Sequence, residues 1–246
     1  MEEIHPRIAL RVPGPWLSSD ELGDALERAE SGYTFAPGEE DQPQLVHIAT
    51  HRRWNIDTSD HDDDLVKVFA GKPRPPTDDE LDAIAQHAVK IHLTGAGGSE
   101  EDARATMHAA TALIRAGGSG VLIDSSTAAH GPTDWLALSN DSHGGGLFWA
   151  YVVVGGSEEE IFSIGMHCLG FRDAEMPGPL DPQSAVFYIQ NFLGYVTQSG
   201  RTVHDGDILG GEDPSYRAIH VPCTRFLPDA PFYNPYGIYR LEKIEE

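Results

Sequence analysis

Residues 151–211 read YVVVGGSEEEIFSIGMHCLGFRDAEMPGPLDPQSAVFYIQNFLGYVTQSGRTVHDGDILGG and carry the most regular patterning of the chain. Residues 149–154 form a short β-branched and aromatic run, and a second apolar run with alternating residues begins at Ile161. Gly155-Gly156-Ser157 lies between the two runs. Two such runs around a glycine pair predict an antiparallel β-hairpin.

A helix of about five turns is predicted to follow the hairpin. Asp181 and Pro182 are a typical N-cap and first-turn pair, and Gly200 is a typical stop signal. The apolar residues between them recur at helical spacing: Ala185, Ile189, Phe192, Leu193 and Val196. We expect this apolar stripe to cover the hairpin, because each surface buries the other.

Three short motifs in the last third of the chain resemble a known bacterial family. They are Gly165-Met166-His167-Cys168-Leu169-Gly170-Phe171, Asn191-Phe192-Leu193-Gly194-Tyr195 and His204-Asp205-Gly206-Asp207-Ile208-Leu209-Gly210. In this order they resemble the C-terminal module of the family known as domain of unknown function 4261, although Met166-His167 and Ile208-Leu209 depart from its pattern. A weaker likeness covers residues 89–138. The resemblance implies a mixed α/β module and brings no established catalytic residues.

The rest of the chain alternates strand and helix signals. Strands are predicted at residues 7–12, 45–50, 89–93, 120–124, 218–221 and 236–241. Helices are predicted after three capping pairs, Ser18 with Glu21, Thr77 with Glu80 and Ser99 with Asp102, and a short helix at residues 133–138. Residues 89–124 have the length of a crossover unit whose two strands lie parallel. We therefore predict an α+β fold, in which a mixed sheet with helices mainly on one face contains strand-helix-strand units and a C-terminal hairpin-plus-helix module.

Residues 51–76 lack a periodic pattern. A basic island precedes Trp54, an acidic run at residues 57–64 holds His61, and three prolines lie at residues 73–76. This stretch is the predicted internal boundary, with residues 1–72 as a strand-helix-strand region and residues 77–246 as an α+β domain. One continuous domain is the alternative.

The formal net charge of −22 over 246 residues excludes the usual binders of nucleic acid and of anionic membranes. A basic protein partner is expected, against the alternative that the charge serves solubility alone. Without a bilayer-length apolar run, and with Met1-Glu2-Glu3 before His5-Pro6 unlike a secretory signal, a cytoplasmic protein is expected. Cys168 and Cys223 are expected to be unpaired thiols.

The stretch Thr94-Gly95-Ala96-Gly97-Gly98-Ser99, between a predicted strand and helix, is similar to part of a dinucleotide-binding turn, and Asp124 closes the next strand. Glu100, Glu101 and Asp102 oppose this interpretation, because they place carboxylates where phosphate would lie. The alternative hypothesis of a small-ligand or nucleotide-binding enzyme uses this loop and the rim after Asp124. Its candidate residues are Gly95, Gly97, Gly98, Ser99, Asp124, Ser125 and His130.

No metal site, cofactor or complete catalytic set is predicted. The histidines and aspartates around His47, His51, His61 and His204 lack a recognised ligand spacing. His167 and Cys168 are not read as a catalytic pair, because neighbours in a strand point to opposite faces.

The aromatic residues Trp54, Phe232, Tyr233 and Tyr236 lie in predicted loops and are candidate anchors for a protein partner. The leading hypothesis is therefore a non-enzymatic acidic cytoplasmic module that binds a basic protein, with toxin neutralisation of the immunity type as the specific role. The oligomeric state is left open by the sequence.

Overall fold

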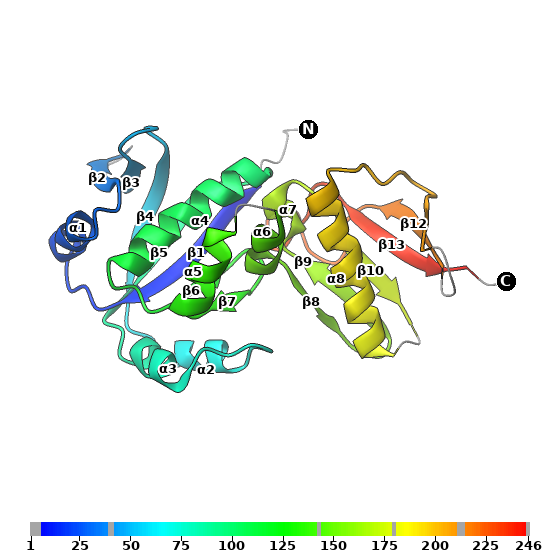
Figure 1. Cartoon of the computed structure of the whole chain (residues 1–246), viewed down its shortest axis with the longest axis horizontal. Helices are drawn as coiled ribbons and strands as arrows, with labels where there is room; N and C mark the ends of the chain where they lie inside the picture. The colour runs from blue at the N-terminus through cyan, green and yellow to red at the C-terminus, as the bar shows by residue number, and fades with distance from the viewer. Residues whose placement is uncertain (1–5, 39–41, 142–143, 179–180, 211–214, 245–246) are drawn as a thin grey trace.

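Two β-sheets organise the computed structural model, which describes residues 6–38, 42–141, 144–178, 181–210 and 215–244 (Figure 1). Gly211 and the chain start from Met1 to His5, used above, lie outside the described residues. None of the described helices is long and apolar enough to cross a membrane.

The first sheet has the strand order β2-β3-β4-β5-β1-β6-β7. Its strands are β1 (Arg7–Gly14), β2 (Tyr33–Pro37), β3 (Pro43–His47), β4 (Arg53–Asp60), β5 (Val89–Ala96), β6 (Val121–Ile123) and β7 (Ala129–His130). Both β5 and β6 pair antiparallel with β1, so they run parallel to each other with β1 between them. The expected crossover is confirmed in direction, but its two strands are not neighbours.

The second sheet has the order β11-β12-β13-β10-β9-β8. Its strands are β8 (Val153–Gly156), β9 (Glu160–Ile164), β10 (Asp173–Pro177), β11 (Ile208–Leu209), β12 (Tyr216–Val221) and β13 (Ile238–Lys243). The pair β10 and β13 is parallel and the other pairs are antiparallel, so the sheet is mixed. The predicted hairpin is confirmed as β8 and β9, which pair antiparallel.

Helix α8 (Pro182–Ser199) covers this second sheet as its sequence predicts. The Asp181 side chain accepts from the Ser184 N–H, and Gly200 ends the helix in the left-handed conformation. The apolar stripe that includes Ile189 and Leu193 is buried.

The other long helix, α4 (Glu100–Arg115), covers β5 and β1 of the first sheet, and four helices pack against it: α1 (Ser19–Arg28), α5 (Pro132–Asn140), α6 (Gly144–Tyr151) and α7 (Met166–Leu169). On β6, Val121 and Ile123 join this main core, whereas Leu122 packs with Phe69 and Ile84 of α2 (Leu65–Ala70) and α3 (Asp78–Ala85). Since alternate strand residues point to opposite faces, α2 and α3 cover the other face of the sheet (Figure 1). The α+β fold is confirmed.

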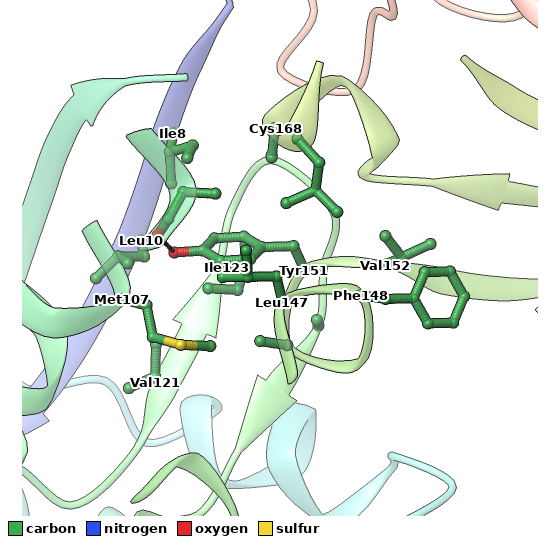
Figure 2. Close-up of a cluster of buried hydrophobic side chains, with 14 of the residues drawn as sticks. Ile8, Leu10, Met107, Val121, Ile123, Leu147, Phe148, Tyr151, Val152 and Cys168 are labelled. Carbon is green, nitrogen blue, oxygen red and sulfur yellow. Dashed lines mark hydrogen bonds between the residues drawn. The ribbon is translucent and has the colours of Figure 1, made fainter. Parts of the chain in front are cut away.

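One continuous core spans both sheets. Tyr151 lies in it beside Leu10, Met107 and Ile123 on one side and near Val152 and Cys168 on the other (Figure 2). Residues 73–76, where we placed the boundary, connect α2 and α3. Along the chain both helices follow β4 and precede β5, and these two strands pair with each other in the first sheet. The chain passes from the first sheet to the second after β7, through α5 and α6.

Three local predictions are corrected by the structure. Residues 149–151, read as the start of a strand, end helix α6, which packs against α5 and α8; Ala150 and Tyr151 are buried there and Trp149 is partly exposed. Residues 51–76 contain β4 and α2, and an additional strand, β2, precedes β3. Strand β3 ends at His47, before the turn in which His51 has φ 58°.

Candidate functional site

The glycine-rich loop after β5 faces the protein's own backbone and offers no amide for a phosphate at Gly97 and Gly98. The N–H of Gly97 donates to the Pro6 carbonyl at 3.0 Å, and the N–H of Gly98 donates to the Cys168 carbonyl at 3.1 Å. The Tyr236 hydroxyl donates to the Gly98 carbonyl at 3.3 Å. The site expected at this loop is therefore occupied by packing between the two halves of the chain.

Four other residues predicted for that site, Gly95, Ser99, Asp124 and Ser125, also make contacts within the protein. Ser99 caps α4 at Asp102, and a Cβ at Gly95 would lie 2.4 Å from the Trp54 ring. Asp124 accepts two bonds from Arg11, at 3.0 Å and 2.7 Å, on the far side of β1 from the loop. Ser125 is buried, and its hydroxyl bonds the backbone of Ala9 and Arg7.

Two of the predicted residues do share a hollow. Asp124 and Phe232 line a space of about 370 Å³ that also holds Arg11 and Asp62. The bidentate salt bridge between the Arg11 guanidinium and the Asp124 carboxylate neutralises both charges in this hollow.

His130 lines a different pocket, of about 200 Å³, at the junction of the two sheets. Its Nδ1 lies 2.7 Å from Asp134 Oδ2, and its Nε2 lies 3.0 Å from the Ala150 carbonyl oxygen. Hydrogen bonding from His130, opposed by burial, holds the pKa of Asp134 below its usual value. The pocket also contains Lys72, whose ammonium donates to the Thr127 carbonyl, and Arg74, whose guanidinium lies 5.4 Å from the centre of the Trp149 ring.

The predicted aromatic anchors pack down instead of projecting. Trp54 is 2% exposed, and its ring N–H donates to Thr106, so its assignment as a loop anchor is wrong. Phe232 packs against Phe226, Tyr236 binds Gly98, and Tyr233 is half-buried. The exposed large aromatics are Trp149, Phe187 and Tyr195, which the sequence reading left out. For Phe187 and Tyr195 the sequence does contain a signal: residues 182–199 have no charged side chain, so the exposed face of this helix has to carry uncharged residues.

A buried polar cluster lies beside the junction of the two sheets. His167 and Cys168 belong to the short helix α7, not to a strand, and the sulfur lies 3.7 Å from His167 Nε2. Burial lowers the pKa of His167 to about 4 and raises that of the Cys168 thiol. Burial also raises the pKa of Asp173 to about 6, although Ser163, Asn234 and the Met166 N–H all donate to its carboxyl group. A thiol held protonated is a poor nucleophile, so this cluster is structural.

Among the described residues, no three or more histidine, cysteine, aspartate or glutamate side chains gather as a metal site. His47 bonds Thr50, and His61 bonds Asp63 and stacks on His87. These histidines are thus held by local contacts.

A hollow of about 840 Å³ lies between α1 and β2. Ser18 caps α1, whose Leu22, Ala25 and Leu26 are buried, so the opposite face of the helix carries its charges into solvent. Four exposed carboxylates line the hollow: Asp20, Asp24, Glu27 and Glu30. None of the described residues that line it is basic.

Apolar residues lie between these carboxylates. Leu26, Phe35 and Ile48 line the hollow, and Ile48 is 56% exposed. Tyr33 also contributes, and burial raises its pKa to about 12, so the hydroxyl stays neutral. We call this hollow the α1–β2 groove; its lining combines apolar side chains with four carboxylates.

Strand β2 is an edge of the first sheet and pairs with β3. The Gly38 N–H donates to the Gln42 carbonyl, and the Ile48 N–H donates to the Gly32 carbonyl. These bonds show that the even-numbered residues of β2 point their backbone N–H and carbonyl groups toward β3. In an antiparallel pair the intervening residues turn their backbone groups outward, so Phe35 presents its N–H and carbonyl at the open edge. An edge of this kind can accept a further strand.

The chain was compared with family models, with curated proteins and with solved structures, and nothing in the three collections matches it. The resemblance of the C-terminal third to domain of unknown function 4261 stays a prediction.

Proposed function

We propose that this protein is a non-enzymatic acidic module that binds a basic protein through the α1–β2 groove. The observation that carries the proposal is the meeting of four exposed carboxylates, the exposed apolar side chain of Ile48 and an open strand edge in this hollow. A net charge of −22 attracts a basic partner over distances near the Debye length, which is about 8 Å at physiological salt.

The groove favours an extended segment of the partner. Main-chain bonds to Phe35 would add a strand beside β2, in the mode known as β-augmentation. Alternate side chains of that strand would then point toward Ile48 and toward the carboxylates of Asp24 and Glu27. A sequence that alternates basic and apolar residues fits this arrangement.

The specific role that we propose is neutralisation of a basic toxin. An immunity-type protein works by covering its target and needs no reactive side chains of its own. The commitment of the glycine loop, Asp124 and Cys168 to internal contacts supports a binding role over a catalytic one.

Fluorescence anisotropy with two labelled peptides tests the proposal. A peptide that alternates lysine and valine should bind, and one that alternates glutamate and valine should not. The double variant Asp24→Lys/Glu27→Lys should weaken binding of the first peptide by at least about tenfold. The control variant Asp78→Lys/Asp79→Lys makes the same charge change at exposed positions of α3, outside the groove. Equal weakening by both variants would mean attraction to the overall charge and would refute a groove site.

A second candidate function rests on the pocket beside His130. Lys72 and Arg74 line this pocket together with the carboxylate of Asp134, which the charge of Arg74 helps to stabilise, and the apolar residues Val152 and Leu138 line the wall. Two cations beside an apolar wall suit a small organic anion. The volume of about 200 Å³ lies below the 300–1,000 Å³ typical of drug-sized sites, so the ligand would be small.

A further inference from the structure

Helix α8 carries no charged side chain in its eighteen residues, although the whole chain has a net charge of −22. One face of the helix is buried on the second sheet, but its opposite face is also apolar in part. Phe187 is 69% exposed and Tyr195 is 49% exposed, and Trp149 of the neighbouring helix α6 is 41% exposed. An exposed aromatic cluster without charges has the composition of the core of a protein interface.

A hollow of about 340 Å³ lies in this surface, between α6 and α8. Trp149, Phe187 and Tyr195 stand around it, and Gly194 contributes no side chain to fill it. A Cβ built on Gly194 would have one neighbour within 4 Å, the amide nitrogen of Gln198 at 3.9 Å. The surface therefore presents a projecting ring at Phe187 and a hollow whose lining includes the buried Gly194.

The polar side chains of the α8 part of this surface are uncharged amides and a hydroxyl. Asn191 donates to the Phe187 carbonyl at 2.8 Å within the helix, and Gln190 and Gln198 are uncharged. Covering the α8 part of this surface carries a small desolvation penalty, because α8 has no charge to remove from water; at Trp149 the Arg74 guanidinium lies 5.4 Å from the ring centre.

We infer that this α6–α8 surface is the interface of a homodimer. Phe187 and Gly194 are seven residues apart, so they lie on one face of α8, two turns from each other. A two-fold axis between Gln190 and Asn191 would pack α8 antiparallel on its copy and place each Phe187 opposite the partner's Gly194. The ring of each copy would then fill the hollow of the other, which is the reciprocal contact of a two-fold interface.

A second copy fits this surface better than a basic partner does. A basic protein gains nothing from an uncharged helix, whereas the α1–β2 groove offers it four carboxylates. Figure 1 places α1 at one end of the long axis and α8 in the opposite half, so a dimer through α8 leaves the groove open.

The two interfaces respond to salt in opposite directions. Two copies that each carry −22 repel one another beyond the contact surface, so salt should strengthen the dimer. Salt should weaken the binding of a basic peptide in the groove. The dimer and the groove can thus be tested separately.

Sedimentation equilibrium of the full chain at about 10 mM and about 1 M NaCl tests the inference, since the Debye length falls from about 30 Å to about 3 Å between them. We expect a monomer–dimer equilibrium whose dissociation constant falls as salt rises. Phe187→Glu should raise that constant by at least about tenfold at either salt concentration. Leu227→Glu, the same kind of change at a residue that is 73% exposed in a loop, should leave it unchanged.

Gly194→Phe provides an independent test, because it fills the hollow and favours the helix over glycine. It should also abolish the dimer while circular dichroism shows an intact fold. A monomer at every concentration in high salt, or equal weakening by Phe187→Glu and Leu227→Glu, would overturn the inference. Tight binding of the basic peptide by the Phe187→Glu monomer would confirm that the two surfaces are separate.

Discussion

The backbone N–H of Gly98 donates to the carbonyl of Cys168 over 3.1 Å, and this contact joins the two halves of the molecule. Gly170 packs against the same place, since a Cβ there would lie 2.5 Å from the Gly98 carbonyl oxygen. Close packing therefore explains the glycines of residues 95–98, since a Cβ would meet the Trp54 ring at Gly95, the Ile8 side chain at Gly97 and the Tyr236 hydroxyl at Gly98. A bound phosphate is not needed to account for them.

Gly98→Ala should destabilise the protein by more than backbone strain alone. Gly98 has φ +91°, where alanine loses about 1–2 kcal/mol, and its Cβ would lie 2.6 Å from the Tyr236 hydroxyl. Gly206→Ala is the matched control, because Gly206 has φ +86° with no atom near its Cβ. In urea unfolding, Gly98→Ala should cost at least about 1 kcal/mol more than the control. Equal losses would show that the contact at Gly98 is loose.

His167 should make stability depend on pH between about 4 and 6.5. Burial lowers its folded pKa to about 4 from the usual histidine value of 6.5, and its Nδ1 is buried without a hydrogen-bond partner in the described structure. The unfolded chain therefore binds the proton first as pH falls, and about 3 kcal/mol of stability, present above pH 6.5, is lost by pH 4. Asp173 acts in the opposite sense, because its raised pKa removes stability as pH rises toward 6.

The difference in unfolding free energy between the natural protein and His167→Gln separates the two groups. It should shift by about 3 kcal/mol in favour of the variant as pH falls from 6.5 to 4. His204→Gln, at an exposed histidine, is the control. A difference that stays constant with pH would place His167 in a polar, hydrated setting.

Tyr151→Phe should cost about 1 kcal/mol, because the buried hydroxyl donates to the Ala103 carbonyl at 2.8 Å and phenylalanine loses that hydrogen bond. Urea unfolding followed by tryptophan fluorescence and by circular dichroism should still show one coincident transition, since the core is continuous around this ring. Tyr233→Phe is the control, because the hydroxyl of this half-buried tyrosine makes no hydrogen bond with the described residues. Two separate transitions would mean that the sheets are independent domains.

Arg74→Gln should weaken the binding of phenylacetate in the His130 pocket by at least about tenfold. The guanidinium stands over the Trp149 ring, so quenching of tryptophan fluorescence measures occupancy. Phenylacetamide, which lacks the charge, and Arg201→Gln, at an exposed arginine, are the controls. Equal affinity for phenylacetate and its amide would remove the second candidate function.

Local signals in the sequence predicted the elements that have strong boundaries of their own. Asp181, Pro182 and Gly200 define α8, and Thr77 with Glu80 forms the predicted capping box of α3. These side chains bond to the backbone beside them, so their effect does not depend on the rest of the fold.

Tertiary contacts decided the elements that the sequence concealed. In β4, Trp54 and Ile56 alternate with polar residues as a half-buried strand should, but the surrounding charges led to a reading as an irregular segment. Trp149 lies in a run with strong β-propensity that is helical because α8 and α5 pack against it. The α1–β2 groove was missed for a similar reason: its edge strand and its carboxylates are brought together by the turn with positive φ at Glu30 and Gly32.

Amide hydrogen exchange at Phe35, measured with and without the lysine–valine peptide, tests the central proposal most directly. The Phe35 N–H points outward from the edge of β2, so a bound strand would protect it. We predict that saturating peptide slows exchange at Phe35 by at least about tenfold and that Asp24→Lys/Glu27→Lys abolishes the effect at the same peptide concentration. Unchanged exchange at Phe35 while the peptide is bound would contradict binding at the α1–β2 groove.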